Sequence, residues 1–166
     1  MIQQTLEKIE IRNAVGGDGV RIWELIKEHG GLDLNSAYCY MVICHHHGKN
    51  CYVAVKDNRL AGFVTAYYLP DLKDTLFVWQ IGVDPDFRGQ GIASKLLDSI
   101  VRNHSNIHEI NTTIEPVNQA SKNLFMSFAK RHGFSVTSKK FIRAEDFPGI
   151  SKHADEDLYI LRKTNQ

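Results

Sequence analysis

An arginine and two glycines stand together in VDPDFRGQGIASKLL, at residues 83–97. Arg88, Gly89, Gln90 and Gly91 form a turn that leads into an amphipathic run. The start of a helix has unpaired N–H groups and a partial positive charge, so it attracts anions. Glycines let this backbone approach a phosphate closely, and the arginine adds a cation. The stretch predicts a pyrophosphate held mainly by main-chain amides, although two glycines can also simply turn the chain.

The surrounding residues narrow the choice of ligand. The turn lacks the G-K-S/T of a Walker A loop and the G-x-G-x-x-G of a dinucleotide site. Gly82 stands inside the apolar run TLFVWQIGV at 75–83, and a glycine in a strand often marks a bulge or the close approach of a ligand. A bulge there would leave strand amides free to bond an extended arm. A ligand with a pyrophosphate at one end and an amide-rich arm at the other is coenzyme A.

The elements that must position this turn follow from hydrophobic periodicity and turn signals. Helices are predicted at 17–31, 37–47, 91–103 and 118–132. Strands are predicted at 8–14, on both sides of the Asp57-Asn58 turn in 51–70, and at 75–83, 109–115, 134–144 and 157–163. In the first helix, Asp18 is the predicted cap, and Val20, Trp23 and either Ile26 or Lys27 share a face. Asn35 or Ser36 is the predicted cap of the second helix. This order predicts an α+β (mixed α/β) class with an antiparallel meander that leads into a parallel crossover.

Length, charge and composition restrict the classes of protein to which the chain can belong. The chain has 166 residues, enough for one domain over 1–166 with a buried core. A net charge of +1 without a basic cluster does not favour nucleic-acid binding, and the apolar runs are too short to span a membrane. The start, MIQQTLEKIE, lacks the pattern of a secretion signal. Cys39, Cys44 and Cys51 are odd in number and lack a metal-type spacing, which predicts reduced thiols in the cytoplasm.

The stretch at 83–97 resembles the acetyl-CoA-binding signature Q/R-x-x-G-x-G/A of the GNAT superfamily of N-acetyltransferases. Arg88, Gly91 and Ala93 stand at the defining positions of this signature. The stretch NQASKNLFMSFAKRHGF, at 118–134, is similar to the next helix of that superfamily. The resemblance implies a GNAT-like acyl-CoA N-acyltransferase fold, with a central mixed, mostly antiparallel sheet flanked by helices. It also implies acetyl-CoA as cosubstrate, without a metal. The residues implied to bind it are Ile81, Val83, Arg88, Gly89, Gln90, Gly91, Ile92, Ala93, Asn118 and Asn123.

A narrower resemblance, to the diaminobutyrate acetyltransferases of ectoine biosynthesis, covers four further stretches. They are LDLNSAYCYMVICHHH (32–47), DTLFVWQIGVDP (74–85), TTIEPVNQAS (112–121) and KHADEDLYI (152–160). This resemblance implies acetyl transfer to the γ-amine of L-2,4-diaminobutyrate by direct attack in a ternary complex, for osmoprotection, in a homodimer. Alternative acceptors are a polyamine, an aminoglycoside or a protein N-terminus. A non-catalytic acyl-CoA-binding module is the alternative from another class.

The acceptor amine needs a base and cation-binding groups. Alkyl ammonium groups have a pKa of about 10.4, so the amine is protonated at neutral pH and must lose a proton. Glu115, at the end of a strand, is the predicted catalytic base. The alternative is that Glu115 is a solvated strand-end residue. Asp33 can pair with an ammonium or serve in a turn. Trp79 can offer its ring face to a cation or pack in the core. Tyr38 and His153 can line the same pocket or face water.

One departure from the superfamily and two clusters need comment. Many members have a tyrosine that returns a proton to the departing thiolate, where this chain has Phe125. Water or Asn123 would have to act, or the thiolate would leave unassisted. Consecutive helix residues do not share a face, so a zinc site at the histidines 45–47 is not expected. Cys44 has no base paired with it in sequence and is expected to be a packed thiol.

Overall fold

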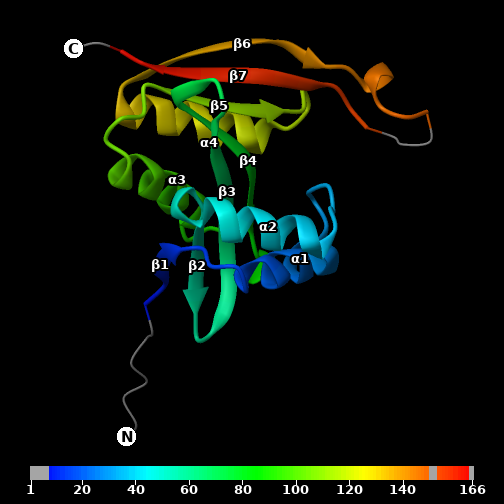
Figure 1. Cartoon of the computed structure of the whole chain (residues 1–166), viewed down its shortest axis with the longest axis vertical. Helices are drawn as coiled ribbons and strands as arrows, with labels where there is room; N and C mark the ends of the chain where they lie inside the picture. The colour runs from blue at the N-terminus through cyan, green and yellow to red at the C-terminus, as the bar shows by residue number, and fades with distance from the viewer. Residues whose placement is uncertain (1–7, 150–152, 165–166) are drawn as a thin grey trace, which may run out of the picture. The chain divides into compact units, whose positions relative to one another are not determined.

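The computed structural model describes residues 8–149 and 153–164. The chain divides into two compact units. Unit 1 is built from the residues up to Ala66 and from Gln80–Asn103, and unit 2 from Tyr67–Trp79 and the residues from His104 onward. The described strands hydrogen-bond in the order β1-β2-β3-β4-β5-β7-β6 (Figure 1). Two of them, β3 (Arg59–Leu69) and β4 (Leu72–Val83), contribute residues to both units.

Unit 1 follows the predicted order of elements. It contains β1 (Glu10–Asn13), α1 (Asp18–His29), α2 (Ala37–His47), η1 (Gly48–Asn50), β2 (Tyr52–Lys56), η2 (Pro85–Phe87) and α3 (Ile92–Asn103), with parts of β3 and β4. Strands β1 and β2, and β2 and β3, pair antiparallel. Asp57 and Asn58 connect β2 to β3 with φ angles of +50° and +60°. These residue types tolerate the left-handed region that a tight hairpin needs, so the predicted turn is confirmed.

The two N-terminal helices cross closely at a glycine. A Cβ atom on Gly19 would lie 2.5 Å from both the N and Cα atoms of Met41, in the backbone of α2. The buried face of α1 includes Ile22 and Ile26, whereas the Val20 side chain is exposed, so the predicted face was wrong in part. Helix α2 begins as predicted, because the Ser36 hydroxyl accepts a hydrogen bond of 3.2 Å from the Cys39 N–H.

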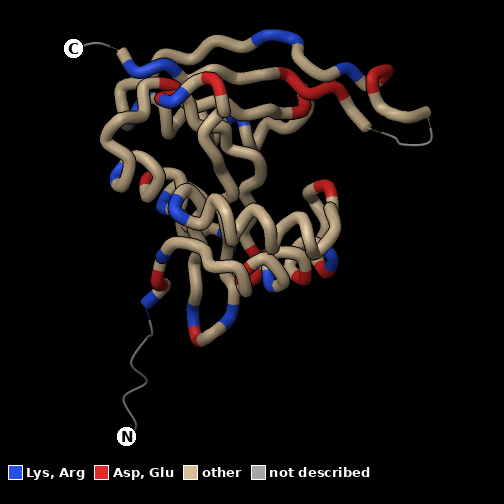
Figure 2. Tube along the Cα trace, viewed as in Figure 1, with Lys and Arg blue, Asp and Glu red and all other residues tan. Residues whose placement is uncertain are grey.

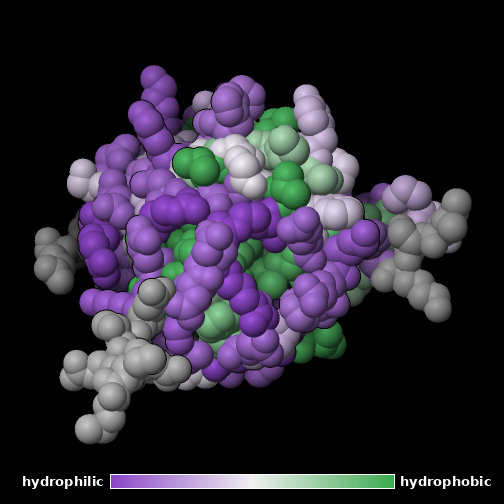
Figure 3. Space-filling model, turned by 90° about the horizontal axis from the view of Figure 1, so that it is seen from below, coloured by the Kyte–Doolittle hydropathy of each residue, from purple (hydrophilic) through white to green (hydrophobic). Residues whose placement is uncertain are grey.

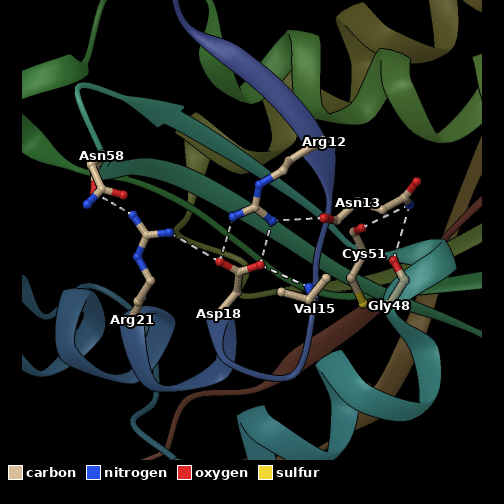
Figure 4. A network of polar contacts seen from close by, with 8 residues as sticks. All are labelled: Arg12, Asn13, Val15, Asp18, Arg21, Gly48, Cys51 and Asn58. Carbon is tan, nitrogen blue, oxygen red and sulfur yellow. Dashed lines mark hydrogen bonds and ion pairs between the residues drawn. The ribbon is translucent and has the colours of Figure 1, made fainter.

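Asp18 is not the helix cap that its position suggests. The N-cap of α1 is Gly17, which makes no side-chain capping bond. The Asp18 carboxylate instead accepts hydrogen bonds from Arg12 at 2.6 and 3.0 Å, from Arg21 at 3.2 Å and from the Val15 N–H at 2.9 Å (Figure 4). Burial acts to raise the pKa of Asp18, but these donors and the two guanidinium charges outweigh it and hold the pKa below its usual value. This network of hydrogen bonds around Asp18 joins β1 to the first turn of α1.

Helix α3 packs an apolar stripe against the strands of its unit. Ile92, Leu96, Leu97 and Ile100 are buried. Gly62 in β3 lets this stripe approach, because a Cβ atom there would lie 3.0 Å from the Ile92 side chain and 2.9 Å from the Gly82 carbonyl oxygen. The start of α3, and thus the glycine turn before it, is therefore fixed by packing against a strand.

Unit 2 contains the closing strands and the last helix. Its elements are β5 (Glu109–Ile114), α4 (Gln119–His132), β6 (Phe134–Ile142), η3 (Ala144–Asp146) and β7 (Glu156–Lys163), with parts of β3 and β4. β4 and β5 pair in parallel, while β5–β7 and β6–β7 pair antiparallel. Phe125, Phe128 and Ala129 form the buried face of α4, and Gly133 ends the helix at a φ of +70°. The parallel crossover and the final pair of strands match the prediction.

Charges of both signs are interspersed along the trace (Figure 2). The face drawn in Figure 3 is mostly hydrophilic, with hydrophobic side chains visible between the polar ones. Within residues 8–149 and 153–164, no helix combines the length and apolar character needed to cross a bilayer.

Candidate active site

The predicted anion-binding turn precedes α3 directly. Residues 88–91 are exposed, and Gly89 and Gly91 have φ angles of +76° and +71°. A Cβ atom at either glycine would meet no heavy atom within 4 Å, so the left-handed backbone, and not lack of space, requires glycine here. α3 begins at Ile92, and the N–H groups of a first helical turn lack helical acceptors. The turn therefore offers exposed main-chain donors next to a cation, Arg88.

A second network holds the segment between β4 and this turn. The Asp84 carboxylate accepts 2.9 Å hydrogen bonds from the Asp86 N–H and from Arg59 Nη2. Arg59 also bonds Asp86 at 2.7 Å and lies over the Phe87 ring at 5.1 Å from its centroid. Because Asp84 is buried, its two charge-assisted bonds fix the chain just before the glycines. Arg59 was not predicted; the signal was a cation at the start of the strand that follows the Asp57-Asn58 turn.

Strand β4 continues past the residues that pair with β5. The parallel register runs from Thr75↔Glu109 to Val78↔Thr112, whereas β4 continues to Val83. Among the described residues, β5 therefore pairs with none of 79–83, the stretch that contains the predicted Ile81 and Val83. Strand backbone on an unpaired edge has N–H and C=O groups available for an extended ligand.

Gly82 has a packing reason for lacking a side chain. A Cβ atom there would lie 2.8 Å from the Phe63 ring and 3.2 Å from the Leu32 side chain. Two residues earlier, the Thr65 hydroxyl accepts from the Gln80 N–H and donates to the Gln80 carbonyl, both at 3.2 Å. The Thr65 side chain in β3 therefore satisfies a main-chain donor and a main-chain acceptor of β4. The bulge at Gly82 itself stays a prediction.

The loop between α1 and α2 is anchored through a backbone carbonyl. The Asp33 carbonyl accepts from Gln80 Nε2 at 2.9 Å and from the Tyr40 hydroxyl at 3.1 Å. That hydroxyl also accepts from the Asn35 N–H at 3.2 Å, and the Tyr40 side chain is fully buried. Asp33 is an exposed residue, and Tyr38 in the first turn of α2 is 75% exposed. Unit 1 therefore positions Asp33 by holding its main chain.

Unit 2 places the predicted base in a turn. Glu115 follows β5, is half-buried, and its carbonyl accepts a 3.0 Å hydrogen bond from the Asn118 N–H. The Asn118 side chain caps α4 by accepting from the Ser121 N–H at 3.0 Å. Asn123 is exposed and accepts from the Gln119 side chain at 2.8 Å. Both asparagines thus have structural partners beside their predicted cofactor role.

Three further predicted positions belong to unit 2. Trp79 is half-buried. The His153 ring stacks on Phe147, with centroids 4.2 Å apart and planes at 19°. Phe125 is 2% exposed, so the position that carries a tyrosine in many superfamily members is filled by a buried ring without a hydroxyl.

Two polar residues escaped the sequence analysis. Gln80 is 8% exposed, and Asp157 lies on β7 opposite Ile114. One side-chain oxygen of each, Gln80 Oε1 and Asp157 Oδ1, is buried without a hydrogen-bond partner among the described residues. An amide inside the apolar run FVWQIGV was the available signal for Gln80. Asp157 was hidden in the acidic stretch DED, which is typical of a solvated segment.

The Cys44 thiol is buried in α2, and the histidines at 45–47 follow it in the same helix. Burial raises the pKa of the Cys44 thiol to about 12, with smaller contributions from Cys51 and Asp18. It also raises the pKa of Cys51 to about 11. Both thiols are protonated at neutral pH and are poor nucleophiles. His45 and His46 are exposed, and no group of three His, Cys, Asp or Glu within the described ranges could hold a metal ion.

The fold and the glycine turn define an acyl-coenzyme A-dependent transferase, and residues 20–134 match the acetyltransferase (GNAT) family. The chain belongs to this family. It is 40% identical over 141 residues to the L-2,4-diaminobutyric acid acetyltransferase of Marinococcus halophilus, covering 84% of this chain and 81% of the relative. The relative of the same name from Halalkalibacterium halodurans is 39% identical over 140 residues, which cover 83% of this chain and 74% of that protein.

A solved structure supports the same relationship. Diaminobutyrate acetyltransferase EctA from Paenibacillus lautus, in complex with L-2,4-diaminobutyric acid and coenzyme A, superposes with a TM-score of 0.91 and 35% identity. The match covers 96% of this chain and 98% of that chain. The predicted GNAT-like fold and the predicted resemblance to diaminobutyrate acetyltransferases are both confirmed.

Proposed function

We propose that this chain transfers the acetyl group of acetyl-CoA to the γ-amine of L-2,4-diaminobutyrate, giving N4-acetyl-L-2,4-diaminobutyrate. The observation that carries the proposal is its likeness, along nearly the whole chain, to a structure that holds this diamino acid and coenzyme A. The glycine turn, and the β4 residues beyond the pairing with β5, supply main-chain groups of the kind that such a cosubstrate needs.

The proposed cosubstrate contacts are largely main-chain contacts. The diphosphate of coenzyme A binds the amides of residues 88–93 beside Arg88, where two glycines keep the backbone accessible. The pantetheine arm bonds the β4 edge at Ile81 and Val83, and an N–H there polarises the thioester carbonyl. One such preorganised donor contributes about 2.7–4 kcal/mol to transition-state stabilisation. Asn118 and Asn123, at the start of α4, complete the proposed contacts.

The reaction proceeds by direct attack in a ternary complex. The neutral γ-nitrogen bonds to the carbonyl carbon, the C–S bond breaks, and the electron pair leaves on sulfur. The proton lost by the amine passes to Glu115, directly or through water. The thiolate takes a proton from water, because Phe125 has no hydroxyl, and Asn123 is proposed to donate a hydrogen bond to it. Holding amine and thioester together lowers the entropic part of the barrier.

Acceptor recognition rests on groups suited to a diamino acid. Asp33 supplies a carboxylate on an anchored loop, and Trp79 supplies an aromatic face for an ammonium group. Tyr38 and His153 are proposed to contact the rest of the substrate. Cys39, Cys44 and Cys51 are unpaired thiols, which supports a reducing, cytoplasmic location. A homodimer that serves ectoine biosynthesis and osmoprotection is proposed from the family resemblance.

A thiol-release assay tests the function. Protein and acetyl-CoA are mixed with diaminobutyrate, spermine, an aminoglycoside or a peptide N-terminus, and free coenzyme A is followed. Turnover on diaminobutyrate with product acetylated at the γ-nitrogen is the expected result. Turnover on another amine alone would reject the acceptor, and coenzyme A binding without turnover on any amine would indicate a binding module.

A variant of the base tests the mechanism. Glu115→Gln is expected to lower kcat by about 100-fold or more, since general bases contribute about 10²–10⁴-fold. Glu145→Gln, an exposed glutamate in η3, is the matched control. Full activity of Glu115→Gln at all pH values would exclude the residue as base.

A further inference from the structure

Gln80 holds an acceptor atom that the protein leaves unused. The side chain is 8% exposed, and its Nε2 donates to the Asp33 carbonyl at 2.9 Å. Its Oε1 is buried without a hydrogen-bond partner among the described residues. A buried, unsatisfied acceptor is rare in folded proteins and is a sign of a ligand or water.

The orientation of the amide follows from its one bond. Exchanging the nitrogen and oxygen would turn Oε1 toward the Asp33 carbonyl, so that one acceptor faced another. The main chain of Gln80 is fixed as well, because its N–H and C=O both bond the Thr65 hydroxyl at 3.2 Å. The lone acceptor is therefore held at a defined position beside the Asp33 loop.

We infer that Gln80 is a specificity-determining residue whose Oε1 accepts a hydrogen bond from the non-reacting α-ammonium group of the acceptor, an inference that rests on the proposed function. A carboxamide oxygen accepts hydrogen bonds but does not take up a proton at neutral pH. It suits the nitrogen that keeps its charge, whereas the reacting nitrogen requires a base. The same side chain anchors the Asp33 loop, so one residue links the loop's position to the charge of the ligand.

If Gln80 Oε1 binds the α-ammonium of the substrate, removing one of these two groups should lessen the effect of removing the other. Gln80→Met keeps the length of the side chain and removes both polar atoms. 4-Aminobutyrate lacks only the α-ammonium of diaminobutyrate. Wild type is expected to bind 4-aminobutyrate about tenfold or more weakly than diaminobutyrate, because losing a hydrogen bond to a charged group commonly weakens binding by that factor. In Gln80→Met the preference for diaminobutyrate over 4-aminobutyrate is expected to fall by about tenfold, because the other groups that face the ammonium are unchanged.

Binding of both compounds to the enzyme–coenzyme A complex is measured by calorimetry, with KM and kcat for diaminobutyrate in parallel. Tyr40→Phe is the matched control, because it removes the other anchor of the Asp33 carbonyl and leaves Oε1 in place. It is expected to weaken both compounds equally. Thermal unfolding verifies that each variant is folded.

An equal loss for both compounds in Gln80→Met would overturn the inference and leave Gln80 as a loop anchor. Wild-type turnover of diaminobutyrate reports on the proposed function, while the ratio between the two compounds reports on Gln80, so each can fail without the other.

Discussion

The guanidinium of Arg59 lies 2.9 Å from the carboxylate of Asp84, joining the first residue of β3 to the residue that follows β4. Asp84 is nearly inaccessible to solvent, and its other oxygen fixes the Asp86 N–H. Arg59 thereby acts on the glycine turn from a distant part of the sequence.

Removal of this arginine is expected to weaken coenzyme A binding. Arg59→Ala leaves the Asp84 carboxylate with one bond fewer and loosens the chain before Arg88. We expect a severalfold rise in the KM for acetyl-CoA with little change in kcat, measured by thiol release. Arg102→Ala, at an exposed arginine in the last turn of α3, serves as control. An unchanged KM in Arg59→Ala would show that the turn holds its shape alone.

Gly91 is expected to be required for its backbone angle. At a φ of +71°, alanine is disfavoured by about 1–2 kcal/mol although its Cβ has room. Gly91→Ala should therefore shift the turn and weaken coenzyme A binding by about tenfold in calorimetry. Gly17→Ala, at a φ of −65° with open space around it, should leave binding unchanged. Equal affinities for the two variants would contradict the main-chain site.

A methyl group at Gly19 is expected to disturb the two N-terminal helices. Its Cβ would lie 2.5 Å from the Met41 backbone, and a helix backbone cannot move aside as a flexible side chain can. Gly19→Ala should lower the free energy of unfolding by about 1–3 kcal/mol, as overpacking commonly does. Urea denaturation gives the value, with Gly149→Ala as the unstrained comparison. A stability equal to wild type would mean that α1 and α2 can separate freely.

The Asp18 carboxylate predicts a loss of stability in acid. Its folded-state pKa is lowered from the ordinary 3.8, so its contribution is present above that value and is lost as the pH falls through the lowered pKa. Between pH 7 and pH 3, wild type should lose more unfolding free energy than Asp18→Asn. Asp71→Asn, at an exposed position, should follow wild type. Parallel curves for wild type and Asp18→Asn would exclude this linkage.

Local signals were sufficient to predict most elements, whereas long-range polar contacts were not accessible. Apolar periodicity predicted the helix at 91–103, and Asp57-Asn58 predicted the hairpin. The buried face of α1 was assigned incorrectly because Asp18 and Gly19 lie on it, and neither residue contributes to a hydrophobic pattern.

In the candidate site, too, local residues could be predicted from the sequence but long-range contacts could not. The glycine turn depends on neighbouring residues and could be read directly. The bond from Gln80 to Asp33 joins residues 47 positions apart, and only folding brings the two together.

The continuity of β3 and β4 across both units restricts how this protein can be dissected. Each unit is assembled from two separate stretches of the chain, so no single cut releases either one intact. Fragment expression or exchange of one unit between relatives would sever two strands. For engineering, the gene must be treated as indivisible, and new acceptor preferences have to be introduced by point substitution within the complete chain.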